Sequence, residues 1–207
     1  FVTLFVVIDP PGCVPIFSSL TAGTTPKHRF DMAVRSSLIA AGVLIAFALG
    51  GEAFLSALGI TLPAFKIAGG LMVFVIAIDM VFEKRTQRRE SRAEGVKSAA
   101  DAAGKPLEQE DISVFPMAIP MLAGPGSIAS VMLLSARTGG DVAQEAVVLG
   151  ALVTVLLLTL LCLLAAGPIM KLMGAKFEGA LTRLLGVVLA ALAAQFVIDG
   201  IKQSFGL

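Results

Sequence analysis

The sequence has few of the residues on which soluble enzymes depend. It contains no Trp, no Tyr, one His and two Cys among 207 residues, and only 15% of the residues are charged. Soluble domains carry about 25% charged residues, so this composition argues against an ordinary soluble enzyme or binding domain. Cys13 and Cys162 lie far apart in apolar stretches without metal-ligand spacing. They predict neither a disulfide framework nor a zinc site.

Several functional classes lack their signature motifs. The formal net charge of +1 gives no reason to expect a nucleic-acid partner. A single His excludes a His-Glu-x-x-His metal helix, and no Walker-type loop is present for coupling to ATP. Residues 138–141 read Thr-Gly-Gly-Asp, which does not fit the Gly-x-Gly-Asp pattern of intramembrane aspartyl proteases. We therefore predict a protein that is not an enzyme and has no cofactor.

Long apolar runs dominate what is present. The chain is 57% hydrophobic, with a mean hydropathy of +0.91. Runs of about twenty apolar residues match the roughly 30 Å hydrocarbon core of a bilayer. We predict an all-α protein embedded in the lipid bilayer, with six transmembrane helices. They are expected at residues 1–20, 34–49 with an extension to 58, 62–82, 112–135, 143–166 and 181–201.

Basic residues indicate how the chain crosses the membrane. Thirteen of the sixteen Lys and Arg follow the first, third and fifth predicted helices. Connections rich in Lys and Arg stay on the cytoplasmic side, which would place both termini outside. Residues 84–111 hold many of these charges, and we expect them to form a solvated cytoplasmic linker that is partly helical at best.

Two apolar runs contain helix breakers. Residues 9–15 read Asp-Pro-Pro-Gly-Cys-Val-Pro, and residues 123–127 read Ala-Gly-Pro-Gly-Ser. A proline inside a helix costs about 3 kcal/mol. At membrane depth, irregular backbone persists only where it is buried in protein or lines a polar cavity. We therefore predict that helices 1 and 4 are broken, and that the two breaks meet at a binding site near the membrane midplane.

The two halves of the chain also match each other. Aligning the Pro-Gly pair at 11–12 with that at 125–126 gives each half three helices in the same order, over residues 1–83 and 112–207. Residues 66–69 (Lys-Ile-Ala-Gly) then match residues 183–186 (Arg-Leu-Leu-Gly). Because three is odd, the halves would have inverted topology, as in many secondary transporters. The alternative is chance similarity between membrane helices.

The candidate substrate-binding residues come from the two breaks. Half-helices that begin near Gly12 and Gly126 would direct their positive ends at the breaks, which suits a carboxylate. Unwound carbonyl groups would suit an ammonium group, so a zwitterionic amino acid fits both. The candidates are Asp9, Pro10, Pro11, Gly12, Cys13, Pro15, Pro120, Gly124, Pro125, Gly126 and Ser127.

Three of the polar residues have two interpretations each. Asp9 is either a site residue with a partner, with a role in ion coupling, or the cap of the helix half that follows it. Asp79 is either a site for a coupling ion or proton, or a group that pairs with a cation or lies near the cytoplasmic headgroups. Ser127 either bonds to substrate or back-bonds to its own helix.

Three sequence stretches together resemble the MarC family. They are Asp-Pro-Pro-Gly-x-x-Pro-Ile-Phe in the first helix, Phe-Lys-Ile-Ala-Gly-Gly in the third and Pro-Met-Ala-Ile-Pro-Met-Leu-Ala-Gly-Pro-Gly-Ser-Ile in the fourth. The resemblance covers essentially the whole chain. It implies a bacterial inner-membrane protein with six helices, related to small neutral amino acid transporters. Many relatives carry Asn where this chain has Cys13.

The combined expectation is a secondary transporter that exports or exchanges small neutral amino acids such as glycine and alanine. The alternative is a channel or a membrane scaffold that transports nothing. The sequence is compatible with a homo-oligomer and leaves the coupling ion open.

Overall fold

The computed structural model describes residues 1–82, 84–102 and 111–206, and these ranges contain helices but no strand. The helices are α1 (Val2–Ile8), α2 (Pro10–Leu20), α3 (Pro26–Ala57), α4 (Leu62–Val81), α5 (Lys84–Ala102), η2 (Ser113–Leu122), α6 (Pro125–Ala136), α7 (Val142–Leu164) and α8 (Ala166–Phe205). The all-α prediction is confirmed.

Most of these helices are long and apolar enough to cross a membrane. Five stretches of the described chain meet that condition, one of which joins α1 and α2 across residues 2–20. The pair formed by η2 and α6 is bent by 53° at its break and counts as a sixth. The structure therefore agrees with the six predicted membrane segments.

Both predicted breaks occur. Asp9 separates α1 from α2 with φ 60° and ψ 65°, in the left-handed region that few residues other than glycine adopt. The second break is wider than the sequence indicates. Inside η2, Phe115 and Ile119 have extended backbone, and each precedes a cis proline, so the irregular stretch begins well before residue 123.

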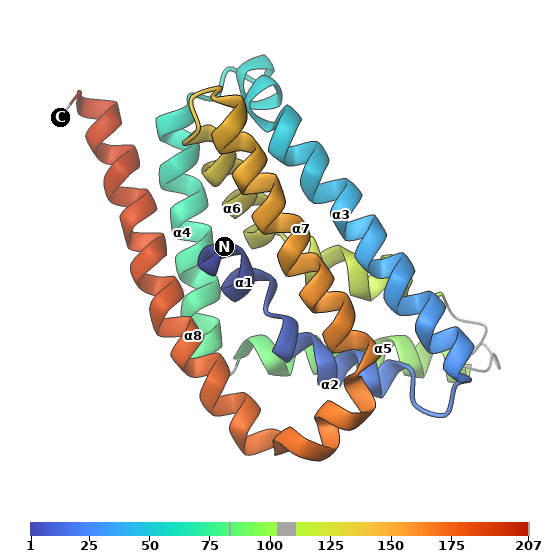
Figure 1. The fold of residues 1–207 in the computed structure, drawn as a ribbon. Coiled ribbons are helices and arrows are strands. Elements are labelled where there is room, and N and C mark those ends of the chain that lie inside the picture. The colour runs from blue at the N-terminus through green and yellow to red at the C-terminus, as the bar shows by residue number, and fades with distance from the viewer. Residues whose placement is uncertain (83, 103–110, 207) are drawn as a thin grey trace.

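The two halves of the chain pack reciprocally. Helix α6 lies against α3 and α4, whereas α2 lies against α7 and α8. Helix α3 also packs on α7, and α4 runs beside α8 over most of its length (Figure 1). In the alignment of the two halves, α2, α3 and α4 correspond to α6, α7 and α8. Exchanging each helix for its counterpart turns the contacts of α6 into those of α2 and leaves the α3–α7 and α4–α8 pairs unchanged, as expected for two related halves.

Glycines bring α4 and α8 together. A Cβ added at Gly70 would lie 3.0 Å from the Ala193 carbonyl oxygen, and one added at Gly186 would lie 3.1 Å from that of Ala77. Such short separations mean that the backbones approach closely, as small residues allow in membrane helices.

The basic connections gather at one end of the bundle. Figure 1 shows the start of α3, helix α5 and the curved first part of α8 at this end, with the C-terminus at the opposite end. The connection between the fifth and sixth membrane segments is itself helical, because Pro168 falls in the first turn of α8, where a proline is tolerated. The cytoplasmic assignment of this end stays a prediction from charge.

Residues 84–102 of the predicted linker are helical, and one side of that helix is less solvated than expected. They form the continuous helix α5, which packs against α2 and α4. Arg89 and Ala93 on this helix are buried. The rest of the predicted linker, residues 103–110, lies outside the described residues.

Candidate functional site

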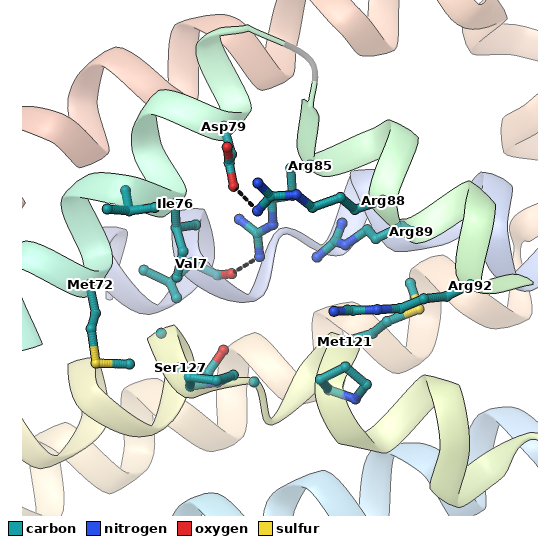
Figure 2. Close-up of a pocket in the computed structure, with 15 residues that line it drawn as sticks. Val7, Met72, Ile76, Asp79, Arg85, Arg88, Arg89, Arg92, Met121 and Ser127 are labelled. Atoms are coloured by element: carbon teal, nitrogen blue, oxygen red, sulfur yellow. Dashed lines mark hydrogen bonds and ion pairs between the residues drawn. The ribbon is translucent and has the colours of Figure 1, made fainter.

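A cavity of about 420 Å³ lies beside the second break, between that break, α4, α5 and the end of α1 (Figure 2). The second break contributes Pro120, Met121, Gly124, Pro125, Gly126 and Ser127 to its wall. Val7 comes from α1, and Met72, Val75, Ile76 and Asp79 come from α4. Helix α5 adds Arg85, Arg88, Arg89 and Arg92.

The structure brings together only part of the predicted site. Every candidate from the second break lines the cavity, and so does Asp79. The candidates from the first break, which are Asp9, Pro10, Pro11, Gly12, Cys13 and Pro15, do not line it. Val7, just before the first break, is the nearest contribution from that side. A site shared equally by the two breaks is therefore not what the structure shows.

At the second break, the N-terminus of α6 has no side-chain cap. Gly124 precedes the helix in an extended conformation, and Pro125 occupies its first turn. The first N–H groups of a helix lack partners within the helix. Gly126 lets this end approach its neighbours, because a Cβ there would overlap Ile76 Cδ1 and lie 3.4 Å from Val7 Cγ1.

Ser127 follows directly in the same turn. Its residue is 2% exposed, and no hydrogen bond links its hydroxyl to any residue that the structure describes. Figure 2 shows the hydroxyl turned towards the side of the cavity where the α5 arginines lie. The interpretation in which Ser127 back-bonds to its own helix is therefore not seen, and the hydroxyl is available to a bound molecule.

The first break is closed by a charged pair. Asp9 Oδ1 accepts a hydrogen bond from Gly12 N at 3.2 Å, and Asp9 Oδ2 lies 2.9 Å from Arg89 Nη1. The two side chains are only 2% and 6% exposed. A Cβ on Gly12 would lie 2.9 Å from that same Arg89 nitrogen, so glycine makes room for the pair. Both interpretations of Asp9 hold in part, because it caps α2 and it has a buried cationic partner.

Cys13 belongs to the core rather than to the cavity. It is fully buried, and its Sγ lies 3.7 Å from the Ile8 carbonyl oxygen. The thiol thus helps to satisfy a carbonyl group at the end of α1.

The arginines of α5 divide by what they contact. Arg85 Nη2 donates a hydrogen bond to the Val7 carbonyl oxygen at 2.5 Å, and Arg88 pairs with Asp79 (Figure 2). Arg92 makes no hydrogen bond or ion pair with any other described residue, and its guanidinium extends into the cavity in Figure 2. Arg92 is therefore the cavity cation that can bind a ligand without first breaking a contact within the protein.

Charge in the cavity is unbalanced. Burial and the nearby Arg89 cation together lower the pKa of Arg85 to about 10, although the Asp9 carboxylate partly offsets them. By formal charge the cavity wall holds four arginines, against Asp79 in the wall and Asp9, which pairs with Arg89. These six described residues carry two more positive than negative groups.

Comparison with known proteins places the chain in a family. The family described as MarC family integral membrane protein matches residues 1–205. The chain belongs to the MarC family. A UPF0056 membrane protein of Methanocaldococcus jannaschii is 36% identical over 202 residues, which cover 98% of this chain and 94% of that protein. The UPF0056 inner membrane protein YhgN of Escherichia coli is 35% identical over 206 residues, covering 98% and 94%.

A third relative comes from another bacterium. The UPF0056 membrane protein YvbG of Bacillus subtilis is 35% identical over 205 residues, covering 99% of this chain and 93% of that protein. No solved structure matches the chain. Membership of the MarC family confirms the resemblance carried by the two breaks and establishes an integral membrane protein. The names of these relatives state a membrane location and no substrate.

The arginines that give the cavity its charge were not among the predicted site residues. In the sequence, residues 84–111 read as one charged stretch, and the spacing of the arginines within it is the signal that could have found them. Positions 85, 88, 89 and 92 follow the i, i+3, i+4, i+7 spacing of one helix face. The other signal was Asp9, because a carboxylate inside a membrane segment demands a partner.

Proposed function

We propose that this MarC-family protein is a secondary transporter that exports or exchanges small neutral amino acids such as glycine and alanine. The observation that carries the proposal is the cavity at the second break, where the uncapped end of α6 faces buried side chains. Its volume of about 420 Å³ lies within the usual range for small-molecule sites. A broken membrane helix that opens onto a cavity is typical of transporter binding sites.

The cavity offers partners for both ends of an amino acid. The N–H groups of Gly126 and Ser127 and the Ser127 hydroxyl suit the carboxylate, because a helix N-terminus attracts anions. Asp79 is the carboxylate of the cavity wall, and it suits the ammonium group. Since Arg88 already pairs with Asp79, binding of the ammonium group would require that pair to rearrange.

Alternating access needs two units that can move against each other. The two halves of the chain are the proposed units, and they interlock, because α2 packs on α7 and α8, whereas α6 packs on α3 and α4. The second break belongs to the second half and lies next to Val7 of the first half. Rocking of one half against the other would expose the cavity to the two sides of the membrane in turn.

Flux measurements in proteoliposomes test the proposal. We expect labelled glycine or alanine to exchange across the membrane, with or without a proton or sodium gradient, and with saturation. Pro125→Ala should reduce the flux by at least about tenfold, because it allows the helix to extend through the break. Pro26→Ala, at the first position of α3 and away from the cavity, is the matched control and should transport normally.

Other outcomes would identify the alternatives. Ion conductance in planar bilayers without saturable amino acid uptake would indicate a channel. Absence of any flux from correctly folded protein would contradict the transporter and favour a scaffold.

A further inference from the structure

The first break shows how this protein holds an oxyanion. The Asp9 carboxylate lies between two kinds of donor, with one oxygen on the backbone N–H of Gly12 at the start of α2 and the other on the guanidinium of Arg89. A helix N-terminus supplies oriented N–H groups and positive potential. The arginine supplies a full charge and a donor fork that fits carboxylate and phosphate.

The second break presents the same two kinds of donor without the acid. Gly124 stands at the cap position of α6, where Asp9 stands for α2, and it has no side chain to place there. The hydroxyl of Ser127, buried at 2% exposure, has no partner among the described residues and is turned towards the arginines in Figure 2. Arg92 extends into the same cavity, also without a partner in the described chain.

We propose that the first turn of α6 and the arginines of α5 form an oxyanion-binding site, which takes the carboxylate or phosphate group of a small solute. Ser127 and Arg92 contact the anion directly. Arg89 is a positioning residue, because its own charge is engaged by Asp9 and it anchors α5 against the first break. The excess of positive groups at the cavity favours an anionic ligand. That the ligand is also the transported solute rests on the function proposed above, whereas its binding does not.

Titration calorimetry on the purified full chain tests the site directly, in a neutral detergent at fixed ionic strength. The probes are sodium acetate, sodium phosphate, glycine and glycinamide, which keeps the amine of glycine but lacks the carboxylate. We expect glycine and acetate to bind and glycinamide not to bind. Phosphate binding at the same site would extend the site to phosphate groups, and its absence would restrict the site to carboxylates; either result supports an oxyanion site.

Variants assign the binding to the cavity. Arg92→Gln should weaken acetate and glycine binding by about tenfold or more, because it removes a charge-assisted contact. Arg92→Lys should retain part of the affinity. Arg35→Gln removes an exposed arginine that pairs with Asp111 instead, so it is the matched control and should bind normally. Because Arg92 lies at the surface of α5, its variants should fold, and their helix content by circular dichroism checks this.

Three results would overturn the proposal. The first is equal binding of glycinamide and glycine, and the second is unchanged affinity in Arg92→Gln. The third is that phosphatidylglycerol nanodiscs stabilise the protein against unfolding only when Arg92 is present, while free acetate and phosphate do not bind. That result would mean that the arginines bind a lipid headgroup. Anion binding without flux would keep the site and remove the transporter. Flux that ignores Arg92→Gln, with anion binding weakened in that variant, would keep both but show that the transported solute does not use this site.

Discussion

At the first break the N-terminus of α2 meets a carboxylate of the chain itself, whereas at the second break the N-terminus of α6 meets a cavity. Both breaks use proline in the first helical turn and glycine close behind it. They differ in the group at the helix N-terminus, which is the Asp9 carboxylate for α2 and no side chain for α6. Asp9 fills the first break permanently, and nothing in the described chain fills the second. The comparison separates a break that holds the fold together from one that is free to bind.

Closure of the first break comes from outside the membrane helices. Arg89 belongs to α5, 80 positions along the chain from Asp9, and both side chains are almost completely buried. Removing two charges from water is costly, and only good geometry and further hydrogen bonds offset it. Gly12 N supplies one such bond. The first break therefore depends on α5, and α5 is held in place by the first break.

The largest effect should come from breaking this pair. Arg89→Met leaves the Asp9 carboxylate buried and unpaired, so we expect a loss of about 3–5 kcal/mol in the free energy of unfolding. Denaturant unfolding in mixed micelles measures it. The double variant Asp9→Asn with Arg89→Met should recover most of the loss, since Asn can also cap a helix and adopt a positive φ. A double variant as unstable as the single one would show that the pair is not what closes the break.

The existence of the two breaks could be predicted from the sequence. Prolines and glycines in apolar runs gave both breaks, because their cost in a membrane helix does not depend on knowing the neighbours. The match between the two halves predicted three membrane segments in the same order in each half, which agrees with the described helices. These features are local in the chain, so one segment at a time reveals them.

That one break is closed by an ion pair and the other opens onto a cavity could not be predicted from the sequence. Which break stays open depends on where α5 docks, and that is decided by contacts between residues far apart in the chain, such as Arg89 with Asp9 and Arg85 with the Val7 carbonyl. The composition of residues 84–111 resembles a solvated linker because its many charges mask the single face that carries the arginines. The helical extension at Ala166 was missed for a similar reason, since Gly-Pro reads as a stop although proline is tolerated in a first turn.

Adding one methyl group at each break should sharpen the contrast. In Gly12→Ala the new Cβ would lie 2.7 Å from Asp9 Cγ, on a short side chain fixed by two interactions, so the ion pair must shift. Overpacking of this kind costs about 1–3 kcal/mol. In Gly126→Ala the overlap is with Ile76 Cδ1, the end of a flexible side chain beside the cavity, and we expect less than about 1 kcal/mol. Unfolding of the two variants in parallel tests this ranking, and the reverse order would mean that the second break is the tighter one.

The smallest change supplies the second break with the anion that it lacks. Ser127→Asp places a carboxylate in the first turn of α6, facing the arginines of α5, where it would occupy the site as Asp9 occupies the first break. We expect the free energy of unfolding to rise by about 0.3–1 kcal/mol, because an acid near a helix N-terminus is stabilising. Acetate should no longer bind in calorimetry. The Asn side chain of Ser127→Asn has nearly the same shape as Asp but no charge. This variant should therefore gain little stability and should still bind acetate. If Asp and Asn behaved alike in both measurements, the positive potential at this break would be too weak to select an anion, and the two breaks would differ in shape alone.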